Sequence, residues 1–372
     1  MQMKSATAQG TKGYKERYNN SLAQDHFRLS QGLWFSSIGL GTYLGASDDQ
    51  TDQAYRAAVQ RAIELGCNVF DSAVNYRFQR SERSVGEALA DLFSRGSLAR
   101  EEIIVATKGG FIPFDTQAPR SRQEMTDYLV ETFITPGICK WDDFVQGSHC
   151  MTPGYLAHQL DQSRQNLRLD CLDIYYIHNP ETQLEEVSQN EFFGRLRLAF
   201  EFLETAVDVG KISAYGTATW NGYRTSPESR GYLPLEEVVQ TAEEVAGAGH
   251  HFKYVQLPVN FGMIEAFTDL NQSLNGRKSN LLEAAADLDV TIISSATILQ
   301  ARLASNLPAI VGEALRGLHT DAQRAIQFTR STPGVTTALV GMSNIAHVEE
   351  NMEVARISPA TLADYMKLFD VR

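Results

Sequence analysis

The sequence holds few cysteines, and they have none of the spacings that mark metal or disulfide sites. Four cysteines are scattered through 372 residues, and no two of them form a CxxC pair. A disulfide-stabilised scaffold is therefore excluded, and a reduced intracellular chain is the simpler interpretation. The cysteines are Cys67, Cys139, Cys150 and Cys171.

Long apolar segments are also missing. No run of eighteen consecutive apolar residues occurs, so the sequence offers no candidate for a membrane-spanning helix. The first twenty residues are polar and lack the apolar stretch of a secretory signal. We therefore expect a soluble, cytoplasmic protein that does not bind a membrane.

Positive charge is scarce. The 33 Lys and Arg residues are outnumbered by 45 Asp and Glu, which leaves a net charge of −12. Nucleic acids and anionic membranes are unsuitable partners for such a chain, because binding them requires clustered basic side chains. The nearest approach to a cluster is Arg77, Arg80 and Arg83. We interpret these residues as solvated charges on a helix face, with an anion site as the alternative.

The sequence does contain a regular alternation of two patterns. Eight short apolar runs are each followed by a segment in which apolar residues recur every three or four positions. In the first such segment, 51–65, Thr51 or Asp52 would suit the N-cap of a helix. The predicted strands are 38–43, 68–73, 103–108, 173–178, 212–217, 254–258, 290–294 and 337–341.

Eight strand-then-helix units without an intervening linker predict a single domain over residues 1–372. The expected fold is a closed (β/α)₈ TIM barrel, and a doubly wound open sheet is the alternative. Residues 27–36 predict an N-terminal β-hairpin with its turn at Gln31-Gly32, which would plug the barrel floor.

A long insertion, 109–153, follows the third predicted strand. Loops after strands lie on the C-terminal face of such a barrel, where active sites form, so we expect this segment to be a lid over that face. Its aromatic residues could line an apolar substrate pocket, or they could pack the insertion onto the barrel. They are Phe111, Phe114, Tyr128, Phe133, Trp141 and Phe144.

Four polar residues stand at or just beyond the ends of successive strands: Asp71, Tyr76, Lys108 and His178. We expect them to converge over the barrel mouth. Lys108 would lower the pKa of the Tyr76 hydroxyl, while Asp71 would hold the Lys108 ammonium. His178 would donate a hydrogen bond that orients a substrate oxygen. Such a group can protonate an alkoxide as it forms.

Each of these four residues also has an ordinary structural explanation, as a turn former, a surface charge or a core histidine. That all four residues occur together, in order, at the ends of successive predicted strands favours the catalytic interpretation. The group contains no nucleophile, carboxylate pair or metal set, so a cofactor such as a hydride donor is expected to supply the missing chemistry. His149 and Cys150 are two potential metal ligands without spaced partners, and we predict no metal site.

At this point the chain resembles the aldo-keto reductase superfamily, from about Ser36 to Met352. The matching runs are IGLGTYLG, NVFDSAVNYRFQRSERSVGEAL, IIVATKGG and LRLDCLDIYYIHNPE, in the family's order. The resemblance implies Tyr76 as the proton donor or acceptor, with Lys108 and Asp71 as the pair that tunes it. It also implies His178 as the group that orients the substrate.

The resemblance further implies a nicotinamide cofactor. Gln256 would hold the carboxamide, with Thr219 in place of the usual asparagine, and Ser294 would reach the pyrophosphate. The stretch LVGMSNIAHVEENM resembles the family's adenosine segment, in which phosphate meets a helix start. Its implied contacts are Gly341, Met342, Ser343, His347, Glu350 and Asn351.

The coenzyme expected from the resemblance is NADP(H), with NAD(H) as the alternative. The sequence departs from the family here, because Ile293 replaces the aromatic residue that stacks on the nicotinamide. His347 is also only a partial substitute for the Arg or Lys that a 2′-phosphate prefers.

The function expected is the interconversion of a small-molecule carbonyl and an alcohol. Trp220, Phe111 and Asn179 are expected to line the substrate pocket. One alternative is a nucleotide-binding regulatory module with little turnover, like the potassium-channel β subunits. Another is a barrel hydrolase or lyase without a nicotinamide, which the lack of a carboxylate dyad disfavours. A homo-oligomer is left open.

Overall fold

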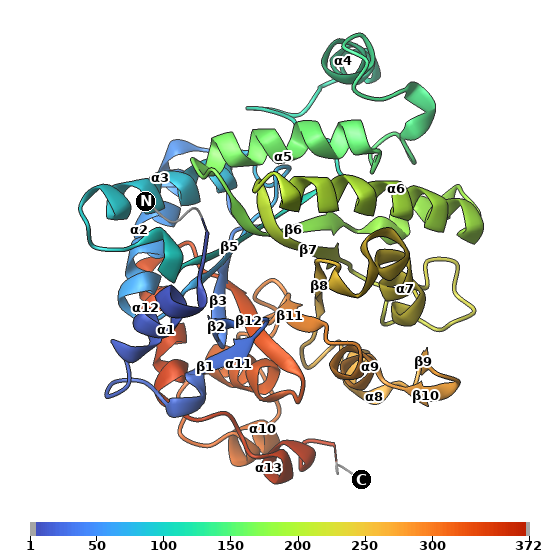
Figure 1. The fold of residues 1–372 in the computed structure, drawn as a ribbon. Coiled ribbons are helices and arrows are strands. Elements are labelled where there is room, and N and C mark those ends of the chain that lie inside the picture. Colours follow the sequence, from blue (N-terminus) through green and yellow to red (C-terminus); the bar gives the residue numbers. More distant parts are fainter. Residues whose placement is uncertain (1–4, 370–372) are drawn as a thin grey trace.

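The computed structural model describes residues 5–369, and its centre is a closed barrel of eight parallel strands (Figure 1). The predicted (β/α)₈ TIM barrel is confirmed, and the open-sheet alternative is wrong. Each barrel strand overlaps one of the eight predicted strands. In the order of their pairing they are β11 (Thr291–Ser295), β12 (Val335–Gly341), β3 (Ile38–Gly41), β4 (Val69–Asp71), β5 (Ile104–Gly109), β6 (Leu172–His178), β7 (Ile212–Ala218) and β8 (Phe252–Pro258), which pairs with β11.

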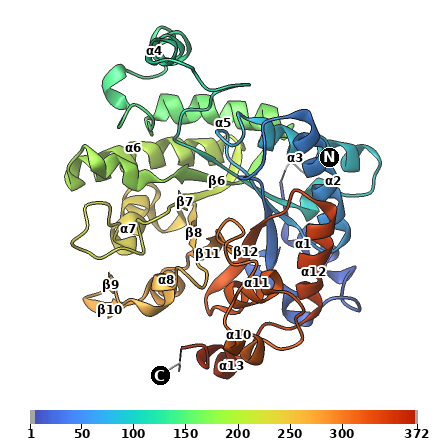
Figure 2. The same cartoon turned by 180° about the vertical axis from the view of Figure 1, so that it is seen from behind.

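Helices surround this barrel, and successive helices contact one another around it (Figures 1 and 2). Helix α2 begins one turn earlier than predicted, because the Asp48 carboxylate, rather than Thr51 or Asp52, caps it by accepting a hydrogen bond from Thr51 N. The helices are α1 (Ala8–Glu16), α2 (Asp49–Glu64), α3 (Arg80–Ser94), α4 (Arg122–Leu129), α5 (Pro153–Leu167), α6 (Gln189–Asp208), α7 (Leu235–Ala246), α8 (Glu265–Thr268), α9 (Leu281–Asp287), α10 (Ala309–Ala314), α11 (Asp321–Ser331), α12 (Ile345–Met352) and α13 (Leu362–Met366).

The predicted N-terminal hairpin is present and closes the N-terminal end of the barrel. It consists of antiparallel strands β1 (Phe27–Ser30) and β2 (Leu33–Ser36), with positive φ angles at Gln31 and Gly32 in the turn. The Phe35 ring is fully buried among apolar side chains from the barrel strands. The expectation that the hairpin plugs the barrel floor is therefore confirmed.

The insertion contains structure of its own and does not cover the barrel mouth. It holds α4 and a π-helical turn over Val130–Ile134, and both views show α4 standing beyond α5, away from the strands (Figures 1 and 2). Most of its rings pack in a separate apolar cluster with Tyr155 of α5, as in the packing alternative. The expectation of a lid is wrong, because Phe111 is the one residue of 109–153 among those that line the cavity described below.

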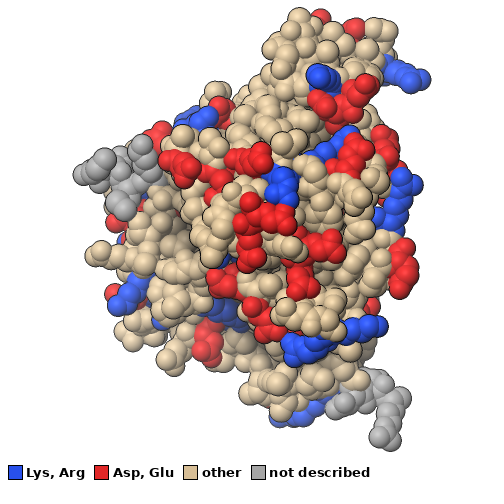
Figure 3. Space-filling view, turned by 45° about the vertical axis from the view of Figure 1, so that its right-hand side comes forward, with Lys and Arg blue, Asp and Glu red and all other residues tan. Residues whose placement is uncertain are grey.

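Some elements were not predicted from the sequence. Helix α1 packs against β2, and a small hairpin of β9 (Gln272–Leu274) and β10 (Arg277–Ser279) lies beside α7 and α9. Acidic side chains are spread widely over the face in Figure 3, in keeping with the net charge of −12. Within 5–369, none of the helices is long and apolar enough to cross a membrane.

Candidate active site

A cavity of about 830 Å³ opens at the C-terminal ends of the barrel strands. It begins at the ends of β3, β4, β6, β7 and β8 and extends past the loop after β11 to the start of α12. Most of the residues singled out from the sequence line it. They are Asp71, Tyr76, Phe111, His178, Asn179, Thr219, Trp220, Gln256, Gly341, Ser343, His347, Glu350 and Asn351.

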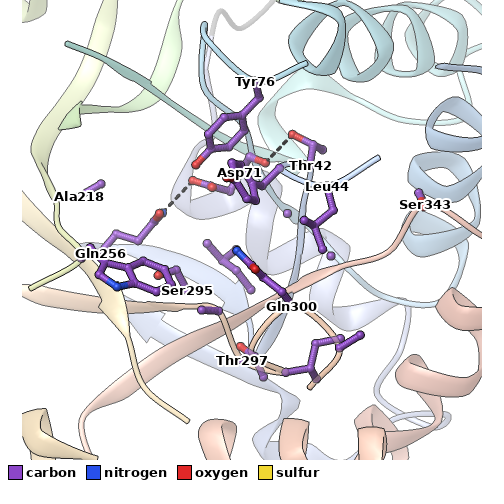
Figure 4. Close-up of a pocket in the computed structure, with 18 of the residues that line it drawn as sticks. Thr42, Leu44, Asp71, Tyr76, Ala218, Gln256, Ser295, Thr297, Gln300 and Ser343 are labelled. Carbon is purple, nitrogen blue, oxygen red and sulfur yellow. Dashed lines mark hydrogen bonds between the residues drawn. The ribbon is translucent and has the colours of Figure 1, made fainter. Parts of the chain in front are cut away.

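Asp71, which lines this cavity, forms an ion pair with Lys108. Lys108 Nζ lies 2.5 Å from Asp71 Oδ1 and also donates to the Ser72 carbonyl at 2.8 Å. The second carboxylate oxygen of Asp71 accepts a hydrogen bond from Gln256 Nε2 at 2.8 Å (Figure 4). Both charged side chains are almost completely buried, so the expected pairing is present and each charge is compensated.

Tyr76 is placed over this pair by an unusual stretch of backbone. The three residues that follow it, Arg77, Phe78 and Gln79, all have positive φ angles. This left-handed turn is held by Arg77, which donates to Asp52 at 2.7 Å and to the Ala46 carbonyl at 2.8 Å. The turn therefore leaves the Tyr76 ring facing the cavity (Figure 4).

Arg77 is not the solvated charge expected from the sequence, and all three arginines of this region are paired with carboxylates. Arg77 is buried and paired with Asp52, and Arg80 also contacts that carboxylate. Arg83 pairs with Asp115 of the insertion at 2.8 Å. Because each guanidinium is neutralised by a carboxylate, these arginines anchor the backbone beside Tyr76.

Lys108 does not lower the Tyr76 pKa as expected. Burial, followed by the nearby Asp71 carboxylate, raises the pKa of Tyr76 well above its usual value. Lys108 Nζ lies 5.1 Å from the centre of the Tyr76 ring, but its charge is compensated by Asp71. Burial also lowers the pKa of Lys108, against the opposing effect of Asp71. The Tyr76 hydroxyl is consequently protonated at neutral pH.

His178 ends β6 and faces the same space. Its ring meets the Tyr76 ring edge-on, with centroids 5.8 Å apart, and the Phe111 ring lies 5.1 Å away on another side. Burial and then the Lys108 charge lower the His178 pKa well below its usual value, so the ring is neutral. Within 5–369, its Nδ1 atom is buried without a hydrogen-bond partner.

The far part of the cavity is formed by the loop after β11 and the start of α12. Asn344 caps α12 by accepting a hydrogen bond from Ala346 N, and Ser343 and His347 border the cavity on either side of this cap. No Lys or Arg occurs among the described residues that line the cavity.

Two residues expected at this site face elsewhere. The Ser294 hydroxyl is fully buried and bonds to the backbone of Val259, while the next residue, Ser295, lines the cavity. Met342 is likewise fully buried in the main core. Neighbouring residues of a strand point to opposite faces, which explains the one-residue error at Ser294.

The sequence interpretation also missed residues that contribute to the cavity. Thr42, Tyr43 and Leu44 follow β3, and Thr297 and Gln300 belong to the loop after β11. Their position directly after a strand was the available signal, because such loops form the site face of a barrel.

The chemistry of the lining fits an extended, polar ligand such as a dinucleotide. Several lining polar atoms are buried and have no partner in the described part of the chain, namely Asn75 Oδ1, Thr219 Oγ1 and Thr297 Oγ1. Unpartnered buried polar atoms are costly, so a ligand that formed hydrogen bonds with these three atoms would offset that cost. In 5–369, no group of three or more potential metal ligands is found.

A family model described as the aldo/keto reductase family matches residues 37–226, just over half of the chain. One relative, "Aldo-keto reductase yakc [NADP(+)]" of Schizosaccharomyces pombe, is 26% identical over 50% of this chain and 41% of its own length. Prostaglandin F synthase 1 of Bos taurus is 22% identical over 88% of this chain and 85% of its own length. The chain spans about half the length of the first curated relatives it matches.

Solved structures agree with the fold. An aldo-keto reductase from Klebsiella pneumoniae in complex with NADPH has a TM-score of 0.62 at 20% identity, covering 94% of this chain and 97% of its own. The aldo-keto reductase AKR11C1 from Bacillus halodurans, in its holo form, has a TM-score of 0.61 at 17% identity, covering 92% and 95%. With the family model matched across the strands that carry Asp71, Lys108 and His178, the chain belongs to the aldo-keto reductase family.

Proposed function

We propose that this protein interconverts a carbonyl compound and the corresponding alcohol, with a nicotinamide dinucleotide as the hydride carrier. The observation that carries the proposal is that Tyr76, His178 and the buried Asp71–Lys108 pair meet at one end of a single elongated cavity. The other end of that cavity reaches the start of α12. A bound reduced nicotinamide supplies a hydride to the carbonyl carbon.

Tyr76 would supply the proton that the reduction also requires. Burial and Asp71 raise its pKa, so the hydroxyl enters the reaction protonated and can donate to the oxygen as negative charge develops there. The transfer leaves a tyrosinate facing the Lys108 ammonium, which is held in place by Asp71. In alcohol oxidation the same groups act in reverse, with the tyrosinate accepting the hydroxyl proton.

His178 would orient the substrate oxygen. Because its pKa is lowered, its ring is neutral and offers one N–H donor. A neutral donor can bind the carbonyl oxygen without competing with Tyr76 for the role of acid. Its contact with the Tyr76 ring places both donors on one side of the cavity.

The coenzyme would lie along the cavity from Gln256 to α12. Gln256 and Thr219 would bind the carboxamide, and Ser295, which lines the cavity, would take the role near the pyrophosphate that the sequence suggested for Ser294. Ser343, His347, Glu350 and Asn351 would surround the adenosine, with Gly341 at the start of that segment. The substrate would then contact Trp220, Phe111 and Asn179.

NADP(H) is the coenzyme that we propose, with a narrow margin over NAD(H). Relatives carry it in their names, among them the Schizosaccharomyces pombe reductase. We expect the protein to bind NADP(H) only slightly more tightly than NAD(H), because no Lys or Arg of the described chain lines the cavity to bind a 2′-phosphate. The same lack of positive charge favours an uncharged substrate.

Purified protein would be titrated with NADPH and with NADH by fluorescence quenching, and turnover would be measured over aldehydes, ketones and quinones. We expect Tyr76→Phe to bind coenzyme normally while its kcat falls by about 10²- to 10⁴-fold, the usual contribution of general acid catalysis. Tyr128→Phe is the matched control, because its hydroxyl bonds to Pro113 in the insertion, away from the cavity. Failure to bind either dinucleotide would overturn the proposal, and binding without turnover would favour the regulatory module.

A further inference from the structure

His149 of the insertion is fully buried and contacts the candidate active site from behind. Its Nε2 atom lies 2.7 Å from the carbonyl oxygen of His178. The Phe111 ring packs edge-on against both imidazoles, with centroids 5.0 Å from His149 and 5.1 Å from His178. His149 thus supports His178, which we place at the substrate oxygen, and Phe111, which we place in the substrate pocket.

The hydrogen bonds around His149 fix which nitrogen carries its proton. Arg195 has only donors, and its Nη1 bonds to Gln183 Oε1 at 2.6 Å. The Gln183 amide nitrogen therefore faces the other way and donates to His149 Nδ1 at 2.8 Å. With Nδ1 accepting, Nε2 is the protonated nitrogen and donates to the His178 carbonyl.

His149 also keeps this form over the working range of pH. Burial lowers its pKa to about 4. The ring is therefore neutral at and above pH 5, and the direction of its hydrogen bonds does not change there. A constant donor of this kind can hold the end of β6 in one position.

The backbone leaves space for this contact. Gly110 has a φ angle of +140°, and a Cβ atom there would lie 2.7 Å from His149 Nε2 and 3.1 Å from the His178 carbonyl oxygen. The two arms of the insertion are paired across the same point, because Cys150 N donates to Gly110 O at 2.9 Å and Ile112 N to Ser148 O at 3.1 Å. The first arm is held from α5 by Gln159, which bonds to Gly110 N and Phe111 O at 2.7 Å each.

We propose that His149 is a positioning residue, which holds the His178 backbone and the Phe111 ring so that the His178 side chain meets the substrate oxygen. This inference rests on the proposed function and deepens it. On this proposal, the insertion fixes the position of His178, the residue that orients the substrate. The contact relay runs from Arg195 through Gln183 and His149 to His178.

Two variants of His149 test the assignment. His149→Phe keeps a ring but removes both hydrogen bonds, and we expect kcat to fall ten- to a hundredfold, because misplacing a reacting group by about 1 Å costs that order of rate. The dissociation constant of the coenzyme should stay within about twofold of wild type. His149→Gln restores an amide donor toward the His178 carbonyl and should recover most of the lost kcat.

His158→Phe is the matched control. It makes the same substitution on α5, where the ring packs against Phe133 of the insertion without contacting His178. A purely structural role of His149 predicts similar losses of kcat in the two Phe variants at equal melting temperature. That outcome would overturn the proposal, as would a wild-type kcat in His149→Phe.

A spectroscopic test does not depend on turnover. In protein labelled with ¹⁵N-histidine, we expect His149 to carry its proton on Nε2 and to remain neutral down to pH 5. The His178 ring signals should shift in His149→Phe and not in His158→Phe. Unshifted His178 signals, or a protonated Nδ1 on His149, would contradict the inference. A wild type that binds coenzyme but shows no turnover would instead contradict the proposed function. The ¹⁵N-histidine measurement would still show whether His149 contacts His178.

Discussion

The two ends of the barrel differ in how their buried polar groups are satisfied. At the N-terminal end, polar side chains bond to the hairpin and to the strand starts. Asn68 is one example, since it accepts from Ser36 N and donates to the Trp34 carbonyl, each at 2.8 Å. Arg28 reaches from the hairpin to the carbonyl of Val335, where β12 begins.

At the C-terminal end, several buried polar atoms have no partner within the described chain. Three of these unpartnered atoms line the cavity, namely Asn75 Oδ1, Thr219 Oγ1 and Thr297 Oγ1, and the unpartnered His178 Nδ1 lies beside it. A buried polar atom without a partner costs roughly 1–3 kcal/mol. At the N-terminal end, Arg100 Nε and Arg330 Nη2 also lack partners within 5–369, but both guanidinium groups form several other hydrogen bonds inside the protein. The unpartnered atoms at the C-terminal end instead face a cavity that a ligand can enter, so that end keeps hydrogen-bonding capacity for a ligand.

The largest effect is expected from removing a partner at the N-terminal end. Asn68→Ala leaves Ser36 N and the Trp34 carbonyl unpaired, so the free energy of unfolding should fall by roughly 2–4 kcal/mol. Urea denaturation measures this loss, and kcat below the transition should equal that of wild type. Asn20→Ala, at an exposed position, is the control. A parallel loss of kcat in Asn68→Ala would break the separation between the two ends.

A smaller effect is expected from acid at the same end. Burial lowers the pKa of His26 to about 3, whereas the unfolded value is near 6.5. The unfolded chain therefore binds the proton first, and stability present above pH 6.5 is lost as the pH falls toward 3. Between pH 6.5 and 5 we expect a loss of about 2 kcal/mol from this group.

The variant His26→Asn isolates the contribution of His26 to acid sensitivity. Its free energy of unfolding should be lower at pH 7 but should fall less steeply between pH 6.5 and 5. Urea midpoints at several pH values measure both slopes. Equal slopes in variant and wild type would show that His26 is not a source of this sensitivity.

The smallest change in stability is expected at the C-terminal end. Thr219→Val removes a buried hydroxyl that has no partner within 5–369, so the free energy of unfolding should change by less than about 1 kcal/mol. Coenzyme affinity should fall about three- to tenfold, the value of one hydrogen bond. Thermal melts with and without coenzyme measure both effects. A strongly destabilised variant with normal coenzyme affinity would reverse the contrast between the ends.

The sequence predicted the parts of this molecule that depend on local pattern and chain order. Strand alternation located all eight barrel strands, and Gln31-Gly32 located the hairpin turn. Asp71 and Lys108 were paired correctly because strand ends meet at one face of a barrel. The burial of Arg77 was missed, since it depends on Asp52, which lies 25 positions away in the chain.

The insertion shows what pattern alone did not reveal. Its helix α4 carried a readable start signal, because Ser121 caps it three residues before Glu124. The contact between His149 and His178 had no comparable signal, since it joins two residues 29 positions apart through the folded arms. The Tyr76 pKa was also misjudged, because the sign of its shift depends on burial and on the charge balance around Lys108.

The paired arms of the insertion also matter for protein engineering and divergence. Since Gly110 and Cys150 are joined by a backbone hydrogen bond, the segment beyond them leaves and re-enters the barrel at one point. The part of the insertion beyond its arms can therefore vary in length without separating them, provided that Asp115, the partner of Arg83, and Val145, whose backbone bonds to that of His149, are also retained. Loop exchange at this point would alter the outer surface of the molecule and preserve the reacting groups.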